Sequence, residues 1–101
     1  MRLGAVIGSV SLKRVHPSLK GVRWIIVQPM SLAALKTSVA EGEPVGDGED
    51  LVVYDELGAG IGQMIAFSEG GEAAAPFHPG KKPVDAYCGL LLDKVVLEDR
   101  K

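Results

Sequence analysis

The feature that most constrains the fold is a strand-like stretch that is apolar on both of its faces. A half-buried antiparallel strand alternates between apolar and polar side chains, because one face meets the core and the other meets water. In residues 84–97 both alternating sets are largely apolar. One set is Val84, Ala86, Cys88, Leu90, Leu92 and Val96, and the other is Tyr87, Leu91, Val95 and Leu97. Both faces of this strand therefore need cover.

The length of the chain makes that need harder to meet from within. At 101 residues, a single domain spanning 1–101 buries only about 60–65% of its unfolded surface, so its margin of stability is thin. With 47% hydrophobic residues the sequence is too apolar for a disordered chain. We therefore expect a folded domain that gains from oligomerisation.

The remaining segments predict a mainly β fold. Strand composition marks four further segments, at 2–14, 22–28, 51–54 and 63–67. A short helix is expected near 32–40, and one helical turn at 72–75. The acidic, glycine-rich residues 42–50 are predicted to be the least constrained part of the chain. Five strands without crossover helices predict an OB-like, antiparallel, five-stranded β-barrel with one or two short helices.

One face of such strands fills the barrel, and the other needs a neighbouring subunit or an attached helix. We favour the neighbouring subunit, because the only helix candidate is short.

Charge and cysteine content exclude several classes of function. The chain has 11 basic and 13 acidic residues, a net charge of −2, which lacks the basic footprint of nucleic-acid binding. No apolar run is long enough to cross a bilayer, and Lys13 and Arg14 interrupt the apolar start, which favours a strand over a signal peptide. The single Cys88 excludes an intrachain disulfide and favours a reducing cytoplasm.

The sequence offers no convincing catalytic, metal or cofactor site. His16, His78 and Cys88 lack zinc-ligand spacing, and Cys88 lies within a strand, where a buried and inert thiol is the default. The acidic residues of 41–50 lack the order of a calcium loop. We therefore expect no enzyme activity, no cofactor and no metal.

The most conspicuous local motif is the glycine loop, Gly58-Ala59-Gly60-Ile61-Gly62. It is not a dinucleotide fingerprint, because its spacing is wrong and a strand follows it instead of a helix. Two interpretations stay open: a flexible or left-handed hairpin connection, or a close backbone approach such as crowding around a symmetry axis.

Several motifs in order resemble the vertex proteins of bacterial microcompartments, the EutN/CcmL family. They are the opening residues 1–10, then His16-Pro17-Ser18-Leu19-Lys20-Gly21, Val27-Gln28-Pro29, Asp55 to Gln63 around the glycine loop, Pro83-Val84-Asp85-Ala86, and Gly89-Leu90-Leu91-Leu92-Asp93. The resemblance covers most of the chain except about residues 31–48, which look like a variable loop or insertion.

The resemblance implies a cyclic pentamer of small β-barrel subunits at the fivefold vertices of a cytoplasmic protein shell. Its partners would be its own copies and the hexameric or trimeric shell proteins, with no catalysis, nucleic acid or membrane. The glycine loop would border the axial pore. The residues that the resemblance places at the subunit interface or in support of the loop are Asp55, Gln63, Pro83 and Asp85.

The chain also departs from the family pattern. Gln63 is neutral where the family commonly has an acidic residue, and residues 70–75 replace a segment that ends in a basic residue. The alternative function is a monomeric OB-like module that binds single-stranded nucleic acid or a small ligand, which should show a basic groove.

Overall fold

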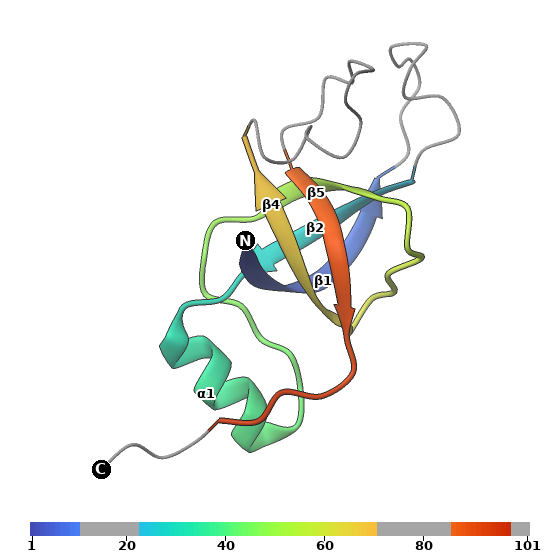
Figure 1. Cartoon of the computed structure of the whole chain (residues 1–101). Helices are drawn as coiled ribbons and strands as arrows, with labels where there is room; N and C mark the ends of the chain where they lie inside the picture. The colour runs from blue at the N-terminus through green and yellow to red at the C-terminus, as the bar shows by residue number, and fades with distance from the viewer. Residues whose placement is uncertain (11–22, 71–85, 98–101) are drawn as a thin grey trace, which may run out of the picture.

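The computed structural model describes residues 1–10, 23–70 and 86–97. Its elements, in order, are β1 (Arg2–Val10), β2 (Arg23–Pro29), α1 (Leu32–Glu41), β3 (Leu51–Asp55), β4 (Met64–Glu69) and β5 (Ala86–Leu92) (Figure 1). The sheet closes on itself in the order β1-β2-β3-β5-β4. This confirms the predicted mainly β fold with five strands in a ring and a short helix. The expected helical turn at 72–75 lies outside the described residues.

The pairing is antiparallel except at one junction. β1 pairs with β2 and β4, β2 pairs with β3, and β4 pairs with β5, all antiparallel. The closure between β3 and β5 is parallel and is registered at one pair, Tyr54 and Tyr87. The sheet is therefore mainly antiparallel, as predicted, and the parallel contact is what closes the ring.

Each strand contributes side chains to the core inside the ring. The buried cluster is apolar throughout and draws on all five strands and on the glycine loop. Its members are Val6, Ile25, Val27, Val53, Ala59, Ile65, Phe67, Ala86 and Cys88.

A β-bulge corrects the predicted faces of the last strand. Phe67 pairs with Cys88 and Ala66 pairs with Leu90, so Gly89 is an extra residue in β5. One extra residue exchanges the two faces of a strand beyond that point. Leu91 therefore pairs with Ile65 and lies on the same side of the sheet, although at the end of the ring it stays 38% exposed, and Leu90 lies on the outer face. The prediction that Cys88 and Leu90 share a face was wrong.

The predicted length of the same strand was also wrong. The apolar pattern suggested a strand continuing to Leu97, but β5 ends at Leu92. Leu92 pairs with Met64, the first residue of β4, so beyond this point β4 offers no backbone to pair with. The chain leaves the sheet here and runs past α1 (Figure 1).

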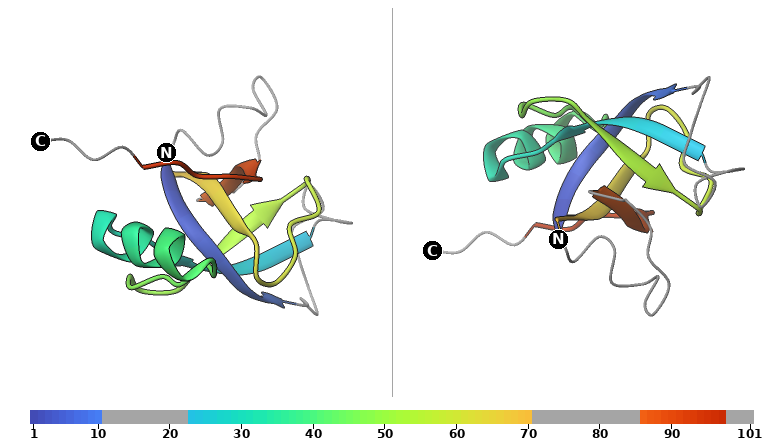
Figure 2. Two further views of the ribbon diagram at one scale, coloured as in Figure 1. Left: turned by 90° about the horizontal axis from the view of Figure 1, so that it is seen from below. Right: turned by 90° about the horizontal axis from the view of Figure 1, so that it is seen from above.

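α1 covers part of the outer face of the ring. Ser31 caps its first turn by accepting a hydrogen bond from the Ala34 N–H at 3.2 Å, and Gly42 ends it in the left-handed conformation at φ 70°. Ala34 packs with Ala5 and Met30, and Leu35 and Met64 join them. Figure 2 shows α1 outside the ring, beside β1. An attached helix thus supplies some of the cover that was expected from a neighbouring subunit.

The segment 42–50 is a loop, as predicted, but the prediction that it is the least constrained part of the chain was wrong. The buried Ser38 hydroxyl of α1 accepts from the Val45 N–H at 2.9 Å. The Asp47 and Gly48 N–H groups donate to the Pro29 carbonyl at 3.0 and 2.9 Å. Asp47 in turn accepts hydrogen bonds from the Ser31 N–H and hydroxyl. These bonds tie the loop to α1 and to the end of β2.

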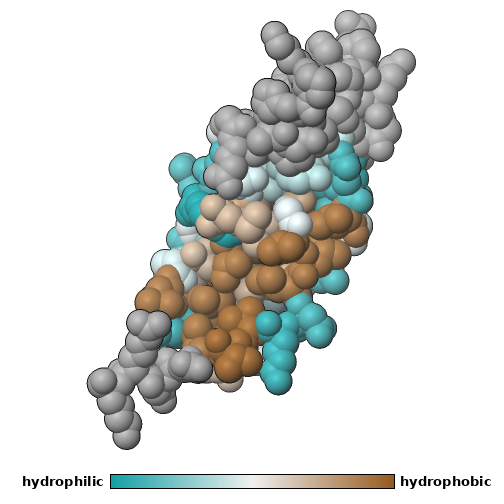
Figure 3. Space-filling view, in the orientation of Figure 1, coloured by the Kyte–Doolittle hydropathy of each residue, from teal (hydrophilic) through white to brown (hydrophobic). Residues whose placement is uncertain are grey.

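Apolar surface nevertheless stays exposed on the described part of the chain. Figure 3 shows it gathered over the lower part of β5 and the segment that follows. Leu90, Leu91, Val96 and Leu97 are all exposed there, which is more than scattered single side chains. Among the described residues, no helix is long and apolar enough to span a membrane.

Candidate functional site

The predicted functional residues gather where β3 passes into the glycine loop. Asp55, the last residue of β3, has a side chain with 0% exposure. Its two carboxylate oxygens accept hydrogen bonds from the Leu57 N–H at 2.9 Å and the Ala59 N–H at 2.8 Å. One buried carboxylate therefore fixes the first half of the connection.

Arg23 compensates the charge of this carboxylate. It lies opposite Asp55 in the register of β2 and β3, and its Nη1 donates to Asp55 Oδ2 at 3.1 Å. The same nitrogen donates to the Ala59 carbonyl. The Arg23 side chain stays 45% exposed, so the guanidinium keeps part of its hydration while it holds the loop.

The core side of this site is apolar and chemically quiet. The Ala59 side chain is fully buried in the core cluster, which anchors the middle of the loop. Burial, reinforced by the negative charge of Asp55, raises the pKa of the Cys88 thiol to about 12. A raised pKa disfavours the thiolate at neutral pH. The prediction that Cys88 is buried is confirmed, and its inertness stays a prediction.

The three glycines of the loop serve different purposes. Gly58 and Gly62 adopt positive φ angles of 81° and 88°, which glycine takes without steric cost. Gly60 does not, and a Cβ built on it would meet only the Gln63 side chain, at 3.7 Å. The left-handed interpretation is therefore confirmed for two positions, and among residues 1–10, 23–70 and 86–97 no backbone comes close to Gly60.

Gln63 closes the second half of the loop. Its Oε1 accepts from the Gly60 N–H at 2.6 Å, and its own N–H donates to the Gly60 carbonyl at 3.1 Å. The Gly62 N–H donates to the Val6 carbonyl at 2.9 Å, and the Val6 N–H donates to the Gln63 carbonyl at 2.9 Å. The loop is thereby joined to β1, while Ile61 projects with 72% exposure.

The structure thus brings together Asp55, the glycine loop and Gln63. Pro83 and Asp85 lie outside the described residues, as do His16 and His78. Whether any of these residues lies at a subunit interface stays a prediction. Sequence reasoning missed Arg23, because only the strand register places it opposite Asp55. Within the ranges that the structure describes, no three His, Cys, Asp or Glu side chains gather as a metal site.

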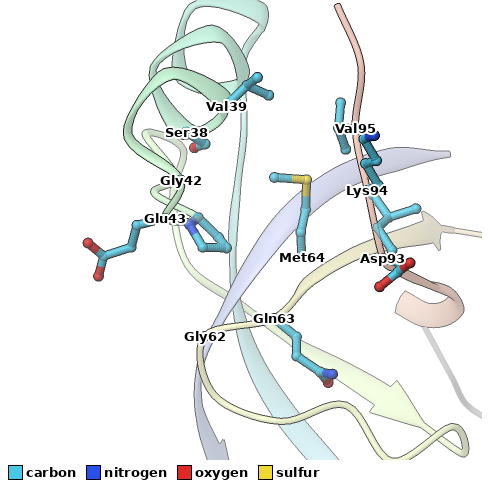
Figure 4. A pocket seen from close by; sticks show the side chains of 12 residues that line it. Ser38, Val39, Gly42, Glu43, Gly62, Gln63, Met64, Asp93, Lys94 and Val95 are labelled. Atoms are coloured by element: carbon cyan, nitrogen blue, oxygen red, sulfur yellow. The ribbon is translucent and has the colours of Figure 1, made fainter.

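A cavity of about 350 Å³ adjoins the loop. It lies between the end of α1 and the segment after β5, and Figure 4 shows Met64 pointing into the space between Val39 and Val95. Gly62 and Gln63 form part of its wall. The sequence pattern does not indicate this cavity, because it predicts a strand over residues 93–97.

The comparisons with known proteins agree with this geometry. Residues 1–93 match the family described as ethanolamine utilisation protein EutN/carboxysome, so the chain belongs to the EutN/CcmL family. The carboxysome shell vertex protein CcmL of Gloeobacter violaceus is 31% identical to it over 100 residues, which cover 99% of this chain and 90% of that protein.

Two solved structures share the fold along nearly the whole chain. GrpN, a pentameric microcompartment shell protein from Rhodospirillum rubrum, has a TM-score of 0.76 at 28% identity and covers 97% of this chain and 100% of that one. CcmL from Gloeobacter violaceus has a TM-score of 0.78 at 28% identity, with 99% and 93% covered.

Proposed function

We propose that this chain is a structural shell protein that forms a cyclic pentamer and caps the fivefold vertices of a bacterial microcompartment in the cytoplasm. The observation that carries the proposal is the likeness, along nearly the full length of the chain, to a shell vertex protein and a pentameric shell protein. A vertex of a closed polyhedral shell needs a fivefold unit, and a small ring of identical subunits supplies one.

The surface of the subunit is compatible with such a ring. A cyclic pentamer uses a heterologous interface, in which each subunit offers two different patches to its two neighbours. The described surface has exposed apolar side chains in separate places, with Leu90 on the outer face of β5, Val52 on β3 and Ile7 at a bulge in β1. Burial of such side chains between subunits favours assembly.

The finer parts of the proposal concern partners and chemistry. The ring would dock its rim against hexameric or trimeric shell proteins, with no catalysis, no cofactor and no nucleic acid. The glycine loop would border the fivefold axis, and the side chains of Asp55 and Gln63 would keep its conformation by accepting backbone hydrogen bonds. The rival function, a monomeric OB-like binding module, is not favoured, because the full-length relatives are shell proteins.

Native mass spectrometry of the purified chain tests the pentamer directly. At micromolar concentration we expect a species of five chains. A monomer or a stable dimer as the only species would overturn the proposal. A mobility shift with single-stranded oligonucleotide that weakens with added salt would support the rival module instead.

A substitution at Gly60 tests the position of the glycine loop. Gly60→Val should disfavour the pentamer by crowding at the axis, while the isolated subunit keeps its fold, because the new Cβ has ordinary contacts within the chain. Gly60→Ala, which adds one methyl group, should have a smaller effect in the same direction. Assembly is followed by native mass spectrometry and folding by circular dichroism. A Gly60→Val ring as stable as the unmodified one would place the loop away from the axis.

A further inference from the structure

The stretch of sequence that contains the glycine loop is uncharged. From Leu57 to Ser68 no residue is acidic or basic, although charged residues make up 24% of the whole sequence. Of the loop's two side chains, that of Ala59 is fully buried and that of Ile61 is 72% exposed. The other three positions are glycines. Isoleucine is therefore the only side chain that the loop can present outward.

The backbone of the loop is not arranged as an anion site. Glycine-rich loops bind phosphate and other anions when several N–H groups point at the ligand. Here the N–H groups of Leu57 and Ala59 donate to Asp55, that of Gly60 donates to Gln63 Oε1, and that of Gly62 donates to the Val6 carbonyl. These four donors are satisfied within the chain, so they are not available to an ion.

The charged residues around the loop are of both signs. Glu43, Asp93 and Lys94 line the adjoining cavity together with Gly62 and Gln63. Asp55 is buried and paired with Arg23, and both hold the loop from its inner side. Glu56 is exposed, but it precedes the loop by two positions. The residue after the last glycine of the loop is the neutral Gln63, and its side-chain oxygen accepts a hydrogen bond from the loop backbone.

We propose that, in the pentamer, five copies of Ile61 form an apolar constriction at the fivefold axis, which makes the axis a barrier to ions. This rests on the proposed function, because it takes the glycine loop to border the axis. Hydrophobic constrictions exclude ions because an ion that enters loses its hydration and meets no polar replacement. Fivefold symmetry repeats each side chain around the axis, so one exposed isoleucine per chain becomes a continuous apolar ring.

Cross-linking tests the placement of Ile61. In an Ile61→Cys pentamer, a short bis-maleimide should join neighbouring chains into covalent dimers, because residues next to the axis are the closest across the ring. The native Cys88 is fully buried and should not react. The matched control is Leu32→Cys. Leu32 is also an exposed aliphatic residue, and it lies at the start of α1, which is on the opposite side of the subunit's β-sheet from the glycine loop (Figure 1).

Dimers from Ile61→Cys but not from Leu32→Cys support the constriction. Because five is odd, at least one chain per ring should stay without a cross-linked partner. An intact pentamer in which Ile61→Cys cross-links no better than Leu32→Cys overturns the constriction and leaves the proposed function standing. Absence of a pentamer from the unmodified chain overturns the proposed function itself.

Charge substitutions test the ring independently. Ile61→Lys and Ile61→Glu should both weaken the pentamer, raising its dissociation concentration by at least about tenfold at low salt, since five like charges repel at close range. Salt should restore most of the loss in both variants. If a positive and a negative side chain weaken the pentamer equally, the cause is repulsion between the five copies. An equal mixture of the Ile61→Lys and Ile61→Glu chains should therefore assemble better than either variant alone. An unchanged pentamer for both variants overturns the constriction.

Crystals of the pentamer soaked in iodide or rubidium test the barrier itself. The unmodified ring should hold neither ion on the axis, whereas the Ile61→Lys ring, prepared at high salt, should hold iodide there. An ordered iodide or rubidium ion on the axis of the unmodified pentamer would overturn the proposal.

Discussion

Two glycine-rich connections in this chain, the 42–50 loop and the glycine loop, are each held by hydrogen bonds to an aspartate. They differ in why they need glycine and in the charge that they carry. In the 42–50 loop, Asp47 accepts hydrogen bonds from the N–H and hydroxyl of Ser31. In the glycine loop, Asp55 accepts from the N–H groups of Leu57 and Ala59. Each aspartate thus holds a stretch of backbone that belongs to neither helix nor sheet.

The glycines of the two connections are required for different reasons. A Cβ on Gly46 would lie 2.4 Å from the Gln28 carbonyl oxygen, so this glycine permits close contact with the chain's own strand. Gly58 and Gly62 have no atom within 4 Å of such a Cβ and are required for their positive φ angles instead. The first connection needs a glycine for close packing, whereas the second needs glycines for its backbone conformation.

The charges follow the same division. The 42–50 loop carries four acidic residues and is tied down to α1 and β2, whereas the glycine loop carries none and exposes Ile61. The 42–50 loop, packed on its own subunit and charged on its outer side, is suited to contact with solvent. An uncharged loop with an exposed aliphatic tip is suited to contact with other copies. The comparison teaches that glycine content alone does not distinguish a structural loop from one available for assembly.

The largest effect on stability is expected from Asp55→Ala. It removes the acceptor of the buried Ala59 N–H and of the part-buried Leu57 N–H, and it leaves Arg23 without its carboxylate partner. The free energy of unfolding should therefore fall by about 3 kcal/mol. Denaturant unfolding measures the loss at matched protein concentration, because assembly makes stability depend on concentration. Asp50→Ala, which removes an equal charge from an exposed site, should cost less than about 0.5 kcal/mol. Equal losses would show that Asp55 contributes only its charge.

A smaller loss is expected from Gly46→Ala. The new methyl group would meet backbone at 2.4 Å and must displace either the 42–50 loop or β2, at a cost of about 2 kcal/mol. The control is Gly8→Ala, whose Cβ would lie 3.5 Å from the Ile26 side chain, an ordinary contact. Thermal unfolding of both variants should separate them clearly. Indistinguishable unfolding temperatures would mean that the close approach at Gly46 is easily relieved.

The sequence predicted the strands better than their faces. Five strands, the short helix and the buried Cys88 all follow from apolar spacing and local propensity, which act over a few residues. The bulge at Gly89 and the end of β5 at Leu92 do not, because both depend on where β4 begins and how it pairs. Register is a property of two segments, and a pattern in one segment cannot supply it.

The candidate site was predictable to a similar degree. The acidic residue before the glycines and the glycine loop itself were visible in the sequence. The partnership of Arg23 with Asp55 needed the pairing of β2 with β3, and the stability of the 42–50 loop needed contacts with Ser31 and Gln28, well away in sequence. Composition alone predicts an unconstrained acidic loop at 42–50, but hydrogen bonds to α1 and to the end of β2 hold it in place.

The smallest effect is expected from the acid dependence of the 42–50 loop. Hydrogen bonds from the hydroxyl and then the backbone N–H of Ser31 lower the pKa of Asp47 below its ordinary value of 3.8. A carboxyl group with a lowered pKa in the folded state adds stability at pH values above its unfolded pKa. That contribution is lost as the pH falls through 3.8 toward the folded pKa. Asp47→Asn should therefore be less stable than the unmodified chain at pH 6, and the difference should shrink below about pH 4. Asp50→Asn, at an exposed position of the same loop, is the control for the loss of one negative charge. Parallel stability curves for Asp47→Asn and the unmodified chain from pH 6 to pH 3 would mean that the ionised carboxylate contributes nothing specific, and that the 42–50 loop is held by its glycine contacts alone.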